Sequence, residues 1–304
     1  MPSKFKVLCA VGVHIDEVLR LNVAARPGES IPAVRETGVG GCAFNVAAAL
    51  SAAGHAVSHA GLRGSFDEGL AAHENDVRTV GAALEAHGVE EIVGRVPLSD
   101  EAHTGVGRYV AMLNPDGTLA LAAAAMEAYA EAGRLAAHPP YREAAETADL
   151  LVLDANASAE HCQALAEARG TDTRLALLAT SAGKASNLAS LVREADIVFA
   201  NEAEWSALGE PSVKLAFVTR GQGGASVIEG GRETASLPSR ARRVASVIGA
   251  GDAFAAGTLD AWLRGAGTVV AMDRGLECAA LCVERPDALS WLDAAKWPSA
   301  GEGA

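Results

Sequence analysis

The chain has 304 residues, half of them hydrophobic, and carries 38 acidic against 25 basic side chains, a formal net charge of −13. This length allows one large domain or two ordinary ones, and the apolar half is sufficient for a core, which excludes global disorder. An acidic chain repels phosphate backbones, so we expect no nucleic-acid partner, although a local pocket for a small anion is compatible with this charge.

The N-terminal segment has none of the features of a membrane-spanning or export segment. Its apolar run, Val7–Val13, is too short to span a bilayer, and Asp16 and Glu17 follow it closely. The five cysteines are an odd number and widely scattered, which argues against a disulfide framework. We therefore expect a cytoplasmic protein with no membrane partner and with free, buried thiols.

The first half of the chain combines helical stretches with hairpin signals. The first apolar run has the composition of a buried strand, and Asn45–Ala53 and Asp76–His87 have that of helices, each followed by a glycine. The turn Asn114–Gly117 lies between two apolar runs, which is the pattern of a β-hairpin. Hairpin signals over residues 14–38 and 104–124 predict a small antiparallel sheet at the edge of a larger one.

From residue 143 onward, strand-like and helix-like segments alternate at the spacing of βαβ units, which predicts a parallel sheet covered by helices on both faces. The expected strands are Leu150–Leu153, Leu175–Ala179, Ile197–Ala200, Leu215–Thr219 and Ala225–Ile228. The expected helices are Ser158–Ala168, Ala185–Glu194, Ala250–Arg264 and Thr268–Leu281. Residues 298–304 are expected to be a frayed tail, so that residues 1–297 form one domain.

The most informative segment is the glycine-rich turn Gly249-Ala250-Gly251, which directly precedes a predicted helix. Small residues let the backbone pass close to a ligand, and the first amide groups of a helix have no acceptor within it. Together with the helix dipole, these amides suit a phosphate or a developing oxyanion. Asp252 lies at the start of the same helix, where a carboxylate can cap the helix or can accept a proton from a substrate hydroxyl. The second role fits phosphoryl transfer.

Five segments of the chain follow one another in a characteristic order. They are Asp16, the run Gly40-Gly41-Cys42-Ala43-Phe44-Asn45, the pattern Asn201-Glu202-Ala203-Glu204, the strand end Val218–Gly221, and Gly249-Ala250-Gly251-Asp252. Each is a weak signal alone, but the set is specific. Together they resemble the motifs of the ribokinase-like (PfkB) carbohydrate kinases, over about residues 5–285.

This resemblance implies a three-layer α/β fold with a mostly parallel central sheet, a small β lid, and ATP- and Mg²⁺-dependent phosphorylation of a hydroxymethyl group. Asp252 would be the catalytic base and Glu204 would organise Mg²⁺ through water. Many of these residues also have a structural explanation, such as Asn201 capping the helix that follows it. A homodimer through the lid is compatible with the family. The other implied roles are an anion hole (Gly249, Ala250, Gly251), substrate binding (Asp16, Gly40, Gly41, Asn45) and nucleotide binding (Asn201, Thr219, Gly221).

The middle of the chain is similar to one subgroup, the pseudouridine kinases. The similar segments are Thr104–Met126, Leu153–Asn156, Ser181–Lys184 and Ala245–Val247. Lys184 would then lie near the substrate or phosphates, or be a solvated lysine at a helix start. A pseudouridine-type nucleoside is therefore favoured, with a free sugar such as ribose or a ketohexose, or an impaired nucleotide- or sugar-binding homologue, as alternatives. Because Ser246 stands where many members carry Asp near a monovalent-cation site, K⁺ dependence stays open. The departures from the family pattern are Ala125, Leu178, Ser246 and Ile248.

Overall fold

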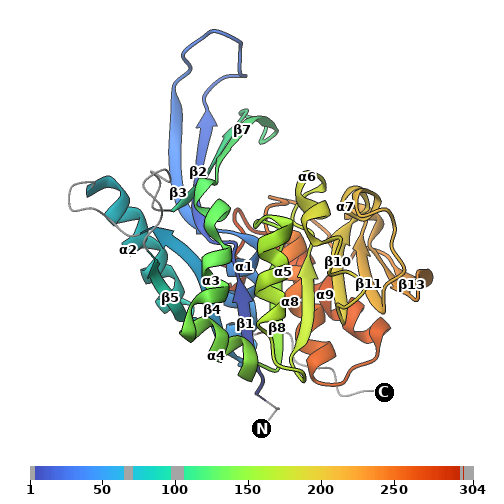
Figure 1. Cartoon of the computed structure of the whole chain (residues 1–304). Coiled ribbons are helices and arrows are strands. Elements are labelled where there is room, and N and C mark those ends of the chain that lie inside the picture. Colours follow the sequence, from blue (N-terminus) through green and yellow to red (C-terminus); the bar gives the residue numbers. More distant parts are fainter. Residues whose placement is uncertain (1–3, 65–70, 97–105, 295–296, 298–304) are drawn as a thin grey trace.

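The computed structural model describes residues 4–64, 71–96, 106–294 and 297, and it contains two sheets (Figure 1). The larger sheet has nine strands in the order β13-β12-β11-β10-β9-β8-β1-β4-β5. All neighbouring pairs from β11 to β5 are parallel, and only β12 and β13 run antiparallel to their neighbours. The strands are β1 (Lys6–Ala10), β4 (Ala56–Gly64), β5 (Glu90–Val96), β8 (Leu150–Asp154), β9 (Arg174–Leu178), β10 (Ile197–Asn201), β11 (Leu215–Thr219), β12 (Ala225–Glu229) and β13 (Arg232–Leu237).

Helices cover both faces of this sheet, so the predicted three-layer fold is confirmed (Figure 1). Strand β8 shows how: Leu150 and Val152 face one hydrophobic core, while Leu151 and Leu153 face the other. The first core is covered by α1 (Cys42–Ala52), α2 (Ala71–Ala86), α8 (Ala250–Leu263), α9 (Thr268–Val283) and α10 (Ser290–Ala294). The second is covered by α3 (Gly133–Ala137), α4 (Pro139–Thr147), α5 (Ala159–Glu167) and α7 (Glu202–Ala207), with short turns such as η1 (Glu127–Glu131).

The smaller sheet, here called the lid sheet, projects from the body of the molecule (Figure 1). Its order is β3-β2-β6-β7, from β2 (His14–Leu21), β3 (Ala33–Gly40), β6 (Gly107–Leu113) and β7 (Leu119–Ala125). The expectation of a purely antiparallel sheet is wrong. Each hairpin is antiparallel, but β2 and β6 are paired in parallel, because two separate hairpins lie side by side in the same direction.

Two predicted elements differ from those in the structure. The first strand ends at Ala10 rather than Val13, because Val11 has a left-handed backbone (φ 88°) and directs the chain into β2. The expected helix over residues 185–194 is replaced by short turns, α6 (Ala182–Ala185) and η2 (Ser186–Leu188).

Parts of two other predictions lie outside the described residues, namely residues 104 and 105 of the second lid segment and the tail over residues 298–304. Within the ranges that the structure describes, no helix is long and apolar enough to cross a bilayer.

Candidate active site

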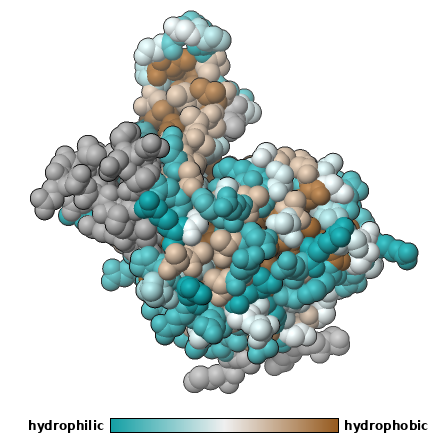
Figure 2. All heavy atoms as spheres, viewed as in Figure 1, coloured by the Kyte–Doolittle hydropathy of each residue, from teal (hydrophilic) through white to brown (hydrophobic). Residues whose placement is uncertain are grey.

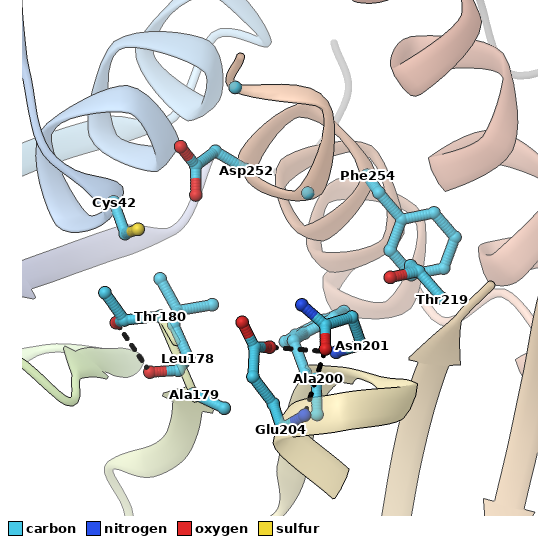
Figure 3. A pocket seen from close by; sticks show the side chains of 13 residues that line it. Cys42, Leu178, Ala179, Thr180, Ala200, Asn201, Glu204, Thr219, Asp252 and Phe254 are labelled. Carbon is cyan, nitrogen blue, oxygen red and sulfur yellow. Dashed lines mark hydrogen bonds between the residues drawn. The ribbon is translucent and has the colours of Figure 1, made fainter. Parts of the chain in front are cut away.

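A cavity of about 260 Å³ lies beside the carboxyl ends of β9, β10 and β11, the edge at which open parallel sheets bind ligands (Figure 3). Helices α1, α7 and α8 complete its wall. Six of the predicted site residues line it: Asn201, Glu204, Thr219, Gly249, Gly251 and Asp252. The seven lining residues for which the sequence predicted no role are Cys42, Leu178, Ala179, Thr180, Phe199, Ala200 and Phe254.

The glycine-rich turn before α8 offers fewer free amides than its sequence predicts. Gly249 has φ 78°, and a Cβ at this position would lie 2.4 Å from the Cβ of Ala288, so only glycine fits. The amide of Ala250, which is not among the cavity residues, donates to the Val247 carbonyl at 3.3 Å. In the described part of the chain, the amides of Gly251 and Asp252 have no acceptor, so these two are free for a ligand.

The Asp252 carboxylate bonds to another helix instead of capping its own. One carboxylate oxygen, Oδ2, accepts a 2.7 Å hydrogen bond from Nδ2 of Asn45 on α1, and the Cys42 thiol lies nearby (Figure 3). Burial raises the pKa of Asp252 to about 6, an effect that hydrogen bonds from Asn45 and Cys42 oppose and that the charges of Asp154 and Glu204 reinforce. A carboxyl group with this pKa is ionised at neutral pH but binds protons far more readily than a surface aspartate.

Asn201 caps the helix that follows it, which is the structural explanation that the sequence also allowed, and Glu204 takes part in the same cap. The Glu204 amide donates to Asn201 Oδ1 at 2.9 Å, and the Asn201 amide donates to Glu204 Oε2 at 2.8 Å, which makes a capping box at the start of α7 (Figure 3). Both residues nevertheless line the cavity, and burial raises the pKa of Glu204 above its usual value. Thr219 also lines it, whereas Gly221 lies in the following turn (Gly221–Gly223) and is not among the cavity residues.

Asp16, Gly40 and Gly41 lie outside this cavity, at the base of the lid sheet. Asp16 is the third residue of β2 and therefore belongs to the lid sheet. Its carboxylate oxygen Oδ1 lies 3.0 Å from Nε2 of His14, and a Cβ on Gly40 would lie only 2.0 Å from its Oδ2. A Cβ on Gly41 (φ 119°) would lie 2.4 Å from the Gly12 carbonyl oxygen. Both glycines are therefore required by close packing.

Lys184 is also absent from the cavity wall, and its ammonium group is already engaged. Its Nζ donates to Asn156 Oδ1 at 2.7 Å, and the Asn156 amide donates to Oδ1 of Asp154 at 3.0 Å. Thr180, which does line the cavity, has φ 65°, a costly conformation for a β-branched residue that is typical of functional sites. No local sequence signal identifies this strain, because it arises from the tertiary packing around β9.

No cluster of three or more His, Cys, Asp or Glu side chains suited to a metal ion exists among the described residues. A divalent cation in this cavity would therefore depend on ligands other than a protein cage. Of the two carboxylates that line the cavity, Asp252 is held by Asn45, whereas Glu204 would bind a cation with one oxygen and leave most coordination positions to water or to a ligand.

The three-layer fold with a separate lid sheet, and a cavity at the carboxyl ends of its strands, are characteristic of α/β enzymes that bind small molecules. The family model described as "pfkB family carbohydrate kinase" matches residues 15–294. The chain therefore belongs to the pfkB family of carbohydrate kinases.

Solved structures agree with this assignment. A carbohydrate kinase from Agrobacterium tumefaciens is 29% identical, with a TM-score of 0.78 and 97% of each chain covered. The ribokinase from Arabidopsis thaliana, solved with ribose and ATP, is 20% identical with a TM-score of 0.75, covering 97% of this chain and 99% of that one. A nucleoside kinase from Methanocaldococcus jannaschii is 15% identical with a TM-score of 0.73, covering 97% of this chain and 100% of that one. The last two likenesses concern the fold alone, and no curated protein sequence matches the chain significantly.

Proposed function

We propose that the protein is an ATP- and Mg²⁺-dependent kinase that phosphorylates a primary hydroxyl group of a nucleoside or sugar. The observation that carries this proposal is the carboxylate of Asp252, whose pKa is raised to about 6, at the start of α8 beside two free amides. A base with this pKa is mostly ionised at pH 7 and yet accepts a proton well, which suits general base catalysis.

In this proposal the residues of the chain supply position and charge. Asn45 holds the Asp252 carboxylate in one orientation, so that the carboxylate can accept the proton of the attacking hydroxyl. The amides of Gly251 and Asp252 and the dipole of α8 stabilise the negative oxygens of the transferred phosphoryl group. Asp16, held over Gly40 at the base of the lid sheet, binds substrate hydroxyl groups as an acceptor. The nucleotide lies beside Asn201, Thr219 and Gly221.

The cavity residues fit a hydrated Mg²⁺ ion. Glu204 gives one oxygen to the capping box and leaves the other for water in a cavity of about 260 Å³. Mg²⁺ keeps several waters and is commonly held by one carboxylate and substrate phosphates. When bound, the ion would neutralise charge on the nucleotide phosphates. The Arabidopsis thaliana ribokinase solved with ribose and ATP supports nucleotide binding as a property of this fold.

For the acceptor, we favour a pseudouridine-type nucleoside because four segments, among them the lid hairpin, resemble pseudouridine kinases. A free sugar such as ribose is the alternative. The test is ADP release from ATP and Mg²⁺ with a panel of nucleosides and free sugars, with Asp252→Asn as the control. Turnover of pseudouridine above every free sugar supports the favoured acceptor, and turnover of free sugars alone refutes it. Calorimetric binding of a nucleoside or sugar without turnover of any acceptor refutes the kinase itself.

We also propose that the lid sheet pairs two copies of the chain. Its edge strand β7 carries Leu121, which is 60% exposed, and Val34 on β3 is 59% exposed; Figure 2 shows apolar side chains on this projecting part. An exposed apolar edge strand favours association with another strand. Sedimentation of the wild type and of Leu121→Glu tests this: we expect a dimer that the variant weakens, whereas a monomeric wild type would refute it.

A further inference from the structure

Asp154 is a buried carboxylate that the proposed reaction does not use. It is the last residue of β8, it has no exposed surface, and burial raises its pKa. Its Oδ1 accepts the Asn156 amide at 3.0 Å, and its Oδ2 accepts the Ala43 amide at 3.2 Å. A buried charge is costly unless it is hydrogen-bonded. The two amides make the buried Asp154 carboxylate tolerable, but they do not explain what the carboxylate does.

The Ala43 amide belongs to the first turn of α1, whose N-cap residue is Gly41. Glycine has no side chain with which to satisfy the amides of that turn, and no side-chain cap is present at this residue. Asp154 therefore caps α1 from a different element, across 111 residues of sequence. A negative charge at a helix N-terminus also interacts favourably with the helix dipole.

The packing around Asp154 shows that its position is tightly specified. A Cβ on Gly12 would lie 1.9 Å from Asp154 Oδ2, and a Cβ on Gly41 would lie 2.4 Å from the Gly12 carbonyl oxygen. The carboxylate, the β1–β2 connection and the start of α1 thus meet at a point where only glycines fit. No substrate atom reaches a carboxylate enclosed in this way.

Helix α1 carries the two side chains that contact the proposed base. Asn45 donates to Asp252 Oδ2 at 2.7 Å, and Cys42, the first residue of the helix, is hydrogen-bonded to Asp252 and lies close enough to Asp154 to feel its charge. We propose that Asp154 is a positioning residue, which fixes the N-terminus of α1 so that Asn45 and Cys42 face Asp252. This inference rests on the proposed function in so far as Asp252 is the base.

The kinetic test compares Asp154→Asn with Asp260→Asn. Asparagine keeps one acceptor for the two amides but places a donor against the other. Asp260 is also a buried carboxylate, paired with His55 and Arg264 near the far end of α8, and serves as the matched control. We expect Asp154→Asn to lower kcat at least tenfold with the KM for ATP within about twofold, since small displacements of catalytic groups cost this much. Asp260→Asn should lower stability but leave kcat within twofold.

A second measurement does not need turnover. Cys42 lies at the cavity and is half-buried, whereas the other four cysteines are buried. Burial, reinforced by the charges of Asp252 and Asp154, raises the pKa of the Cys42 thiol, so loosening the cap should expose and activate the thiol. We expect iodoacetamide to label Cys42 several times faster in Gly12→Ala, which displaces the Asp154 carboxylate but keeps its charge, than in the wild type or in Asp260→Asn, as measured by peptide mass spectrometry.

Wild-type labelling of Cys42 in Gly12→Ala together with wild-type kcat in Asp154→Asn would overturn the inference. If Asp154→Asn does not fold, Gly12→Ala displaces the same carboxylate and is read by the same two measurements. If the wild type phosphorylates no acceptor, the proposed function fails, but the labelling of Cys42 in Gly12→Ala still decides whether Asp154 holds α1.

Discussion

Asp252→Asn should inactivate the enzyme and, at neutral pH, make it more stable. Asparagine preserves the shape of the side chain and its contact with Asn45 but cannot accept a proton, so we expect kcat to fall by about two to four orders of magnitude. The pKa of Asp252 is raised from 3.8 in the unfolded chain to about 6 in the folded one, so ionising it opposes folding. Removing the charge removes that cost.

The size and the pH window follow from this difference in pKa. Below pH 3.8 the carboxyl group is protonated in both states and costs nothing; the cost grows between pH 3.8 and 6 and is then constant. At 1.36 kcal/mol per pKa unit, the full cost is about 3 kcal/mol at pH 8 and about half of that at pH 5. These are upper limits, because the carboxylate partly faces the cavity.

Urea denaturation of the wild type and of Asp252→Asn at pH 5 and pH 8 measures this directly. We expect the stability gain of the variant to be about twice as large at pH 8 as at pH 5. A variant that is less stable than the wild type by the same amount at both pH values would show that Asp252 is an ordinary structural carboxylate. Wild-type turnover in the variant would independently refute its role as the base.

Three further outcomes are expected. For the wild type, kcat/KM should fall about tenfold per pH unit below pH 6, as Asp252 is protonated; a flat profile between pH 5 and 7 would contradict this. Glu204→Gln keeps the oxygen that accepts the Asn201 amide but loses the charge, so a Mg²⁺ titration of the rate should show a half-maximal concentration raised at least tenfold. Gly40→Ala should displace the Asp16 carboxylate and raise the KM for the acceptor about tenfold without changing that for ATP; equal effects on both would argue against substrate binding by Asp16.

The sequence predicts a strand correctly where its apolar pattern runs without interruption. The predicted bounds of the strand Leu215–Thr219 are those of β11, because this segment is a continuous apolar run. Strands β4 and β5 were not predicted, since polar side chains such as His59 and Glu90 interrupt their apolar pattern. The parallel pairing of β2 with β6 could not be predicted either, because no local feature of one hairpin depends on which strand it pairs with, about 90 residues away in the sequence.

The residues of the candidate site also fall into two groups, those that the sequence predicts and those that it does not. Asp252, Glu204 and Thr219 were identified by motifs, and all three line one cavity. The position of Asp154 against Gly12 is a property of three elements that meet only in the folded chain, as is the left-handed backbone of Thr180. Motifs therefore predict which residues line the cavity, whereas the groups that hold them in place follow from packing.

The charge of the cavity leads to a last prediction, about metal removal. Asp252 and Glu204 face it, Asp154 is buried close by, and Lys184 is committed to Asn156. In a protein with a net charge of −13, this arrangement repels a polyphosphate, and two amides at the start of α8 are too few to compensate.

Calorimetry with a non-hydrolysable ATP analogue should therefore show binding at least ten times weaker in EDTA than with Mg²⁺. Glu204→Gln should bind the analogue more tightly than the wild type in EDTA, because it removes one of the repelling charges, and more weakly with Mg²⁺, because it removes the carboxylate that orients the hydrated ion. Equal affinities with and without the metal would show that the cavity holds the phosphates by donors of its own, and the assignment of Glu204 to Mg²⁺ would then be wrong.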